Sequence, residues 1–217
     1  MSSAASFSAP GTQPGWFGKL PGMGDFAHRR LPEAFRERWD HWLQTGLLQL
    51  RHQHADWTAH YLQSPLWFFV LAPQVAGARP WIGVLMPSVD GVGRYFPFTI
   101  ACELAVPLQG LSQALWAEML RWWQHAAQCA LAALEQDLDA TGVDALLSHP
   151  PAEGTEVAQP VAALPLMPDW PEDGQSLWLT DLRDVQAPRL RSAGLPRSAR
   201  FGRLFGFDDA ADALPLN

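Results

Sequence analysis

Residues 15–25 read GWFGKLPGMGD, and this stretch decides how the rest of the chain is interpreted. It holds four glycines and one proline. Glycine serves positions with positive φ or a close backbone approach, and proline removes a backbone donor, so a long helix or strand is excluded here. The same stretch carries large apolar side chains, which are normally buried. It therefore predicts a tight, buried loop, with a short strand at 16–19.

A second stretch, residues 86–98, reads MPSVDGVGRYFPF and repeats this composition. Four charged residues lie among the glycines and aromatics of the two stretches: Lys19, Asp25, Asp90 and Arg94. A buried charge persists only when it is paired. One reading is structural, with Arg94 bridging the two loops through Asp25 or Asp90. The other places Arg94 or Asp25 in an exposed groove that meets a partner.

Four segments together resemble the TagF family of type VI secretion system-associated proteins: GWFGKLPGMGDF, LPEAFRERWDHWL, SPLWFFVL and WIGVLMPSVDGVGRYFPF. The resemblance covers residues 15–104 and, more weakly, the later SLW and GLP segments. It implies a cytoplasmic bacterial protein that represses the secretion machine after translation by binding its forkhead-associated scaffold protein. The chain departs from the family pattern at Leu179, where a second tryptophan is expected after Trp178.

The resemblance also singles out motif positions with a structural or partner-binding role. These are Trp16, Phe17, Gly18, Lys19, Pro21, Gly24, Asp25, Phe26, Trp39, Pro87, Ser88, Asp90, Gly93, Arg94, Phe96 and Pro97.

Composition narrows the classes of function. The net charge of −7 argues against binding to nucleic-acid phosphates, and residues 103–175 hold one arginine against eleven acids. That acidic region predicts a solvated helix face and a polar linker, with a basic partner surface as the alternative.

The eleven tryptophans predict a bulky core, with a few left for a partner surface. Cys102 and Cys129 lie in apolar runs, which predicts buried free thiols.

The hydrophobic periodicity predicts helices at 33–51, 55–62, 111–138, 142–148 and 198–205, and strands at 66–71, 81–86, 96–104 and 176–182. The long helix should bury one stripe, and Thr141 should cap the short helix that follows. The predicted stripe is Leu115, Met119, Trp122, Trp123, Ala126, Ala130, Leu134 and Leu138.

This order of elements predicts an α/β fold with a mixed, mostly antiparallel sheet, for which the resemblance implies a three-layer α/β/α sandwich. We expect a disordered tail at 1–14, the TagF-like domain at 15–149 and an acidic, proline-rich linker at 150–175. Residues 176–217 should then add a strand and a short helix to the same domain. No apolar run reaches the roughly 18 residues that span a bilayer, so we expect no membrane insertion.

Catalytic and cofactor motifs are absent from the sequence. Gly18-Lys19 is followed by Leu20, so the hydroxyl of a phosphate-binding P-loop is missing, and we expect no cofactor. His52, His54 and His60 could share a metal, although surface histidines are the simpler reading. Three hypotheses follow: a monomeric, non-enzymatic repressor of type VI secretion, an assembly adaptor of the same machine, or a phosphate- or nucleotide-binding enzyme.

Overall fold

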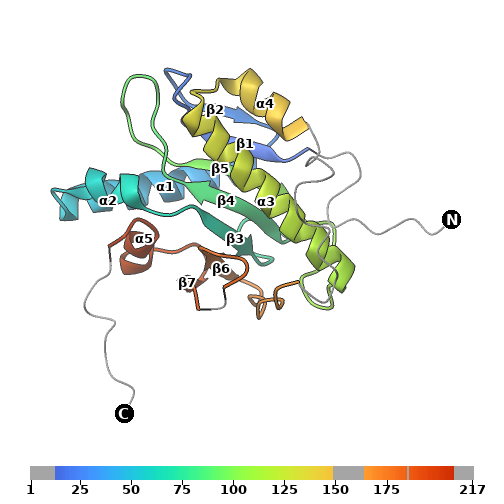
Figure 1. Cartoon of the computed structure of the whole chain (residues 1–217). Helices are drawn as coiled ribbons and strands as arrows, with labels where there is room; N and C mark the ends of the chain where they lie inside the picture. The colour runs from blue at the N-terminus through green and yellow to red at the C-terminus, as the bar shows by residue number, and fades with distance from the viewer. Residues whose placement is uncertain (1–12, 149–163, 185, 208–217) are drawn as a thin grey trace, which may run out of the picture.

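The computed structural model describes residues 13–148, 164–184 and 186–207. Its described strands form one sheet in the order β2-β1-β5-β4-β3-β6-β7 (Figure 1). The strands are β1 (Gly15–Gly18), β2 (Ala27–Arg29), β3 (Trp67–Leu71), β4 (Trp81–Met86), β5 (Phe98–Glu103), β6 (Gln175–Leu179) and β7 (Arg189–Ala193). The helices are α1 (Glu33–Gln53), α2 (Trp57–Gln63), α3 (Gln113–Glu135), α4 (Ala140–Ser148) and α5 (Ala199–Leu204).

The predicted α/β class is confirmed, but the prediction of a mixed sheet is wrong. All six pairings between the described strands are antiparallel. The β3–β4 and β4–β5 connections are short, whereas a parallel neighbour requires a longer crossover, usually through a helix. The strand predicted from residue 96 begins at Phe98, because Phe96 and Pro97 belong to the preceding loop.

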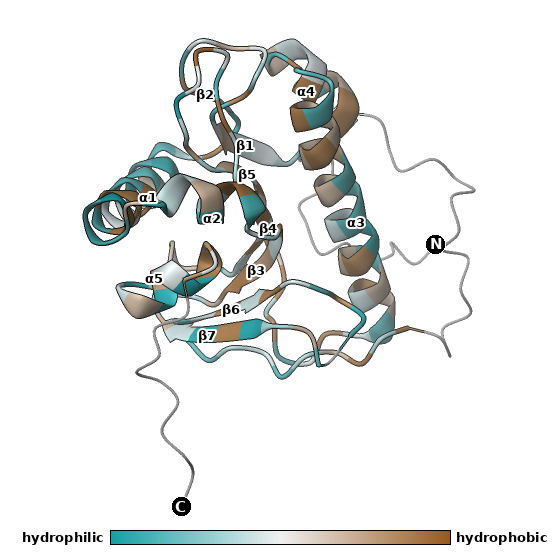
Figure 2. Ribbon diagram, turned by 60° about the vertical axis from the view of Figure 1, so that its left-hand side comes forward, coloured by the Kyte–Doolittle hydropathy of each residue, from teal (hydrophilic) through white to brown (hydrophobic). Residues whose placement is uncertain are grey.

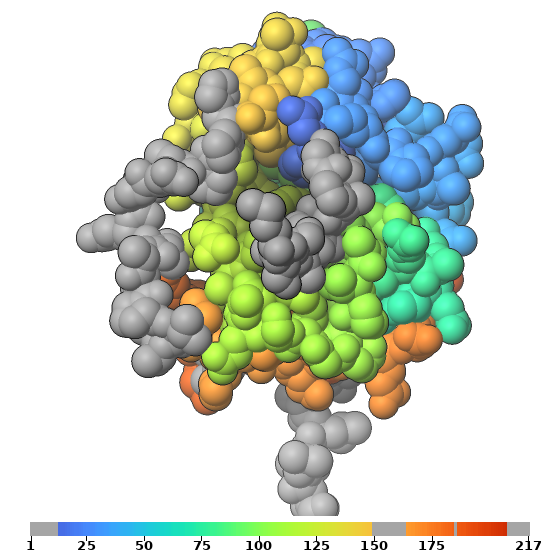
Figure 3. Space-filling view, turned by 90° about the vertical axis from the view of Figure 1, so that its right-hand side faces the viewer, coloured from blue at the N-terminus to red at the C-terminus, as the bar shows by residue number. Residues whose placement is uncertain are grey.

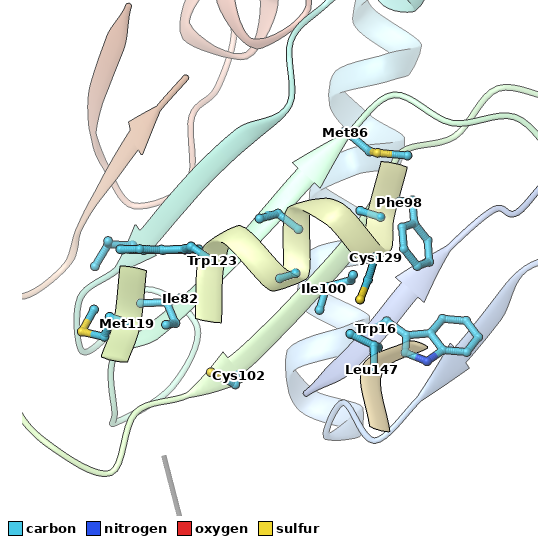
Figure 4. Packing of buried hydrophobic residues seen from close by; sticks show 14 of the residues in the cluster. Trp16, Ile82, Met86, Phe98, Ile100, Cys102, Met119, Trp123, Cys129 and Leu147 are labelled. Carbon is cyan, nitrogen blue, oxygen red and sulfur yellow. The ribbon is translucent and has the colours of Figure 1, made fainter. Parts of the chain in front are cut away.

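Helices lie on both sides of this sheet (Figure 2). On one side α3 and α4 cover a cluster that includes Trp16, Ile82, Phe98 and Trp123, shown in Figure 4. On the other side α1, α2 and α5 cover a cluster rich in aromatic rings. Its members include Phe35, Trp39, Trp42, Phe69, Trp178 and Phe201. The sheet is thus buried on both faces, as its continuous apolar strands predict.

The long helix buries half of the predicted stripe, namely Met119, Trp123, Ala126 and Ala130. Leu115, Trp122 and Leu134 are only partly buried, and so is Leu138, which lies beyond the helix. The buried side chains of α3 are Trp116, Met119, Leu120, Trp123, Ala126, Cys129, Ala130 and Ala133. The helix begins after Ser112, whose hydroxyl accepts the Leu115 N–H. Because apolar residues occur on neighbouring sides of this helix, spacing alone does not fix which side faces the sheet.

The cap of the short helix α4 also differs from the prediction. Thr141 lies inside the helix, and the Asp139 carboxylate accepts the Gly142 N–H at 2.8 Å instead. This helix is fastened to the N-terminal part of the chain, because Asp144 accepts hydrogen bonds from Trp16 Nε1 at 2.8 Å and Arg30 at 2.7 Å. Figure 3 shows the same contact as adjoining yellow and blue surfaces.

The C-terminal part completes the sheet. Strand β6 pairs with the edge of β3 that faces away from β4. Strand β7 pairs with β6 and is the outermost strand on this side of the sheet. The described half of the predicted linker packs on the body, with Trp116 Nε1 donating to the Pro165 carbonyl at 2.8 Å. The predicted N-terminal tail and the first half of the linker lie largely outside the described residues.

Both cysteines are buried free thiols, as predicted. Burial raises the pKa of the Cys129 thiol to about 11 and that of Cys102 further. Both side chains therefore stay protonated and unreactive at neutral pH.

Candidate functional site

Two glycine-rich loops lie side by side at one end of the sheet, and we call them the two-loop site. Loop 1, residues 19–26, leaves β1, and loop 2, residues 87–97, joins β4 to β5. Because β1 pairs with β5, the loops leave the sheet together, and Figure 1 shows them adjacent in blue and green. The Gly91 N–H donates to the Met23 carbonyl at 2.8 Å and joins them directly.

A glycine at the base of loop 1 makes this approach possible. Gly18 has φ +141°, a conformation that favours glycine, and a Cβ there would lie 2.2 Å from the Pro97 carbonyl oxygen. No side chain can replace it without moving one of the loops. The glycine-rich pattern of loop 1 thus has a cause in the backbone at Gly18, which needs both a positive φ and a close approach to Pro97.

Asp90 is the central side chain of the two-loop site, and it is fully buried. Its Oδ1 accepts the backbone N–H groups of Val92 at 3.2 Å and Arg94 at 2.8 Å. Its Oδ2 accepts Lys19 Nζ at 2.9 Å and Arg94 Nε at 2.8 Å. Burial acts to raise the pKa of Asp90, but the hydrogen bonds from Lys19 and Arg94 outweigh it and hold that pKa well below its ordinary range.

Arg94 bridges the two loops, but its second anchor is not a carboxylate. Its Nη2 donates to the Gly24 carbonyl in loop 1, while Nε binds Asp90 in loop 2. The predicted bridge through Asp25 is not formed, because the Asp25 Oδ1 accepts the Phe26 N–H at 2.8 Å instead. Asp25 is exposed, as the second reading of the sequence expected of Asp25 or Arg94. More than half of the Arg94 side chain, 55%, stays accessible to solvent.

A buried tyrosine from α2 supports the site from below. The Tyr61 hydroxyl donates to the Ser88 carbonyl and accepts the Ser88 N–H, each at 2.9 Å. The Ser88 hydroxyl donates to the Lys19 carbonyl at 2.8 Å. Burial raises the pKa of Tyr61, so its hydroxyl keeps its proton. Tyr61 escaped the sequence analysis, although its rarity, as one of two tyrosines, was a usable signal.

Aromatic rings form the outer part of the site. Phe26 packs against Phe17 and Phe96, with ring centroids 5.8 Å and 4.7 Å away, and the Lys19 ammonium lies 5.0 Å from its ring centroid. Phe26 is nevertheless 41% exposed, and Val92 at the tip of loop 2 is 68% exposed. Phe26, Val92 and Arg94 therefore present apolar surface and one cation to solvent; we call these three residues the exposed rim.

The other predicted motif residues divide into loop and core positions. Pro21 and Pro87 are half-buried in their loops, Pro97 is buried, and Gly24 and Gly93 are exposed. Trp16 and Trp39 are core residues on opposite faces of the sheet, and Trp39 Nε1 donates to the Thr99 hydroxyl at 2.9 Å. The structure thus brings the loop residues together and leaves the two tryptophans in the clusters beneath them.

The chemistry of the two-loop site is that of a fixed scaffold. Each buried polar side chain described above is hydrogen-bonded to another group of the protein, and these bonds hold the two loops in one arrangement. In the described part of the chain, no three His, Cys, Asp or Glu side chains gather where a metal ion could be held. His54 and His60 pack on the Phe207 ring, and His52 is exposed.

Comparison with known proteins identifies the family. A family model described as the TagF N-terminal domain, type VI secretion system-associated, matches residues 15–149, which include both loops of the site. The chain belongs to the TagF family. This TagF chain is also similar to a solved structure, PA0076 from Pseudomonas aeruginosa PAO1, at 32% identity and a TM-score of 0.71. That similarity covers 94% of this chain and 98% of the other.

No curated protein matches the chain. Among the described residues of this TagF chain, none of the helices is both long and apolar enough to cross a membrane. Leu179, the position that departs from the family pattern, is buried in the cluster beneath α3.

Proposed function

We propose that this TagF chain is a non-enzymatic, cytoplasmic regulator that represses type VI secretion after translation. It does so by binding the forkhead-associated scaffold protein of the machine, and the two-loop site is the contact surface. The family match supports the association with type VI secretion, and the scaffold partner follows from the resemblance of the sequence motifs. We also propose that the fold is a three-layer α/β/α sandwich, and the helices on both sides of the sheet support this (Figure 2).

The observation that carries the proposal is the exposed rim over a rigid base. The rigid base consists of three buried side chains, Lys19, Ser88 and Asp90. Lys19 of loop 1 donates to Asp90 of loop 2, and the Ser88 hydroxyl of loop 2 donates to the Lys19 carbonyl. These hydrogen bonds fix the two loops, and with them the three residues of the exposed rim. Large apolar side chains and arginine are enriched where proteins contact one another. A surface that is already ordered loses little conformational entropy on binding.

The experiment is a titration of the purified protein against the purified scaffold. The wild-type protein should bind stoichiometrically, and Val92→Glu should weaken binding at least tenfold, because it would bury an unpaired charge in the interface. Leu166→Glu is the matched control, since Leu166 is 81% exposed next to Pro165, which contacts Trp116 near the N-terminal end of α3, and loop 1 packs near the opposite end; this variant should bind normally. Binding should persist after phosphatase treatment of the scaffold.

A secretion assay in the native host tests the sign of the regulation. Overproduction of the protein should stop type VI secretion while the amounts of the machine's components stay constant, and Val92→Glu should relieve this block. Deletion of the gene should raise secretion. A fall in secretion on deletion would instead identify an assembly adaptor, and undiminished secretion at large excess over the scaffold would rule out repression.

A further inference from the structure

A cavity of about 540 Å³ lies between α1 and the segment that leads from β7 into α5. Its third wall is the turn after β3, which contains Gln74 and Val75. We call it the α1–α5 cavity. In Figure 1 α5 lies below α1, whereas the two-loop site lies above it, so the cavity is separate from the site described above. Its volume is in the range of pockets that bind small molecules.

The walls of the cavity are fixed by contacts that keep it open. Trp42 Nε1 donates to the Pro196 carbonyl at 2.6 Å, and the Arg38 guanidinium donates to the Val75 carbonyl at 2.7 Å. At one end Gly46 allows the Phe201 ring to approach, since a Cβ there would lie 2.3 Å from that ring. Helix α5 therefore packs closely at Gly46, while the stretch of α1 nearer its N-terminus faces the connecting segment and the turn after β3.

The polar lining of this cavity is basic and rich in donors. Arg38, His41 and Arg197 line it as solvent-exposed side chains, and none of the lining residues, all within the described chain, is an aspartate or glutamate. Two carboxylates lie at its margin: Glu37, one turn before His41 on α1, and the exposed Asp173, 3.5 Å from the Gln74 amide. Among described residues, His41 and Arg197 have no recorded side-chain partner. A cavity so lined favours an anion, because arginine binds carboxylate and phosphate groups through paired hydrogen bonds.

Apolar side chains form the floor of the cavity. They are Trp42, Val75, Leu195 and Phe201, which are largely buried, and the polar residues Thr45, Gln49, Gln74 and Ser198 lie beside them. A flat apolar body would lie on this floor while its charged group meets the arginines. We propose that the α1–α5 cavity is a binding site for a small organic anion with a planar apolar body. Such an occupant touches α1 and the 194–198 segment together, and it therefore holds α5 against α1.

Three probes that share one ring system test the proposal: 1-naphthyl phosphate, 1-naphthoate and the uncharged 1-naphthol. Titration calorimetry of the full chain should show saturable binding of at least one anion and none of 1-naphthol at the same concentration. Hydrogen exchange of residues 194–205 should slow when the anion is bound.

Variants decide whether the cavity is the site. Arg197→Gln and His41→Leu break none of the contacts described above, and together they should weaken anion binding about tenfold or more, since the first removes a cation and the second a ring N–H donor. Arg200→Gln is the matched control, because Arg200 is exposed on α5 and does not line the cavity. The proposal is overturned if neither anion binds saturably, or if the Arg200 variant loses as much anion affinity as the double variant. Neither outcome bears on the proposed function, because binding to the scaffold is measured separately.

Discussion

At the residue scale, the Lys19–Asp90 pair determines the stability of the two-loop site. Both side chains are buried. Removing Lys19 leaves the buried Asp90 carboxylate with the half-exposed Arg94 as its remaining cationic partner. We expect Lys19→Met to lower the free energy of unfolding by about 1.5–3 kcal/mol. Arg94→Ala should lower it less, by about 1 kcal/mol, because the buried Lys19 still neutralises Asp90 and Arg94 is largely exposed. Urea unfolding at pH 7 measures both, and equal losses would contradict this assignment.

The same carboxylate predicts a pH dependence. Because the pKa of Asp90 is lowered in the folded state, its contribution is complete above the unfolded pKa of about 3.9 and is lost as the pH falls toward the folded value. The stability difference between the wild type and Asp90→Asn should therefore be constant from pH 7 to 5 and shrink below about pH 4. A difference that grows as the pH falls would mean that the pKa of Asp90 is raised.

Part of this site could be predicted from residue types alone. Glycines, prolines and isolated charges in residues 15–25 and 86–98 indicated two packed loops with a charge bridge. The sequence could not choose between Asp25 and Asp90, because that choice depends on which carboxylate the folded loop turns inward. The rarity of tyrosine could single out Tyr61 but could not place it beneath the loops, since it comes from α2, 27 residues before Ser88.

At the element scale, the contact between α1 and α5 depends on Gly46. Gly46→Ala should destabilise the protein by about 1–2 kcal/mol, because overpacking against the buried Phe201 ring exceeds the gain in helix propensity. Gly142→Ala in α4 is the control: its Cβ would meet the side chains of Leu138 at 3.2 Å and Asp139 at 3.5 Å, and it should be neutral or stabilising.

A double variant checks the cause of that loss. Phe201→Leu shortens the side chain that Gly46→Ala would strike, so the two substitutions together should cost less than the sum of the single effects. Thermal unfolding of all four proteins gives the comparison. Strict additivity would show that the loss at Gly46 has another origin.

The elements themselves were predictable to different degrees. Strands 67–71 and 81–86 are apolar runs of strand length, and α1 has a clear apolar stripe, so these were found. Strand β2 has three residues and one buried side chain, which leaves no pattern to detect. Strand β7 alternates exposed and buried residues, RLRSA, and this signal was present but overlooked.

At the scale of the whole molecule, the family-matched segment depends on the residues that follow it. Strand β6 covers the edge of β3, and Trp178 packs between Trp39, Trp42 and Phe69. A fragment of residues 15–149 should therefore aggregate or bind hydrophobic dyes, because it exposes a strand edge and an aromatic surface. Residues 1–207 should unfold cooperatively in the same assay. A soluble, cooperative 15–149 fragment would refute this dependence.

The position of β6 in the sheet also determines when the fold can be completed during synthesis of the protein. Translation proceeds at about 5–20 residues per second, so the roughly 70 residues after α4 take about 3–14 s to appear. During that interval the nascent chain already carries both glycine-rich loops, yet the sheet beneath them lacks its last two strands. A newly made molecule therefore completes the sheet beneath its loops only once its C-terminal strands have left the ribosome, and until then its open β3 edge is a natural substrate for chaperones.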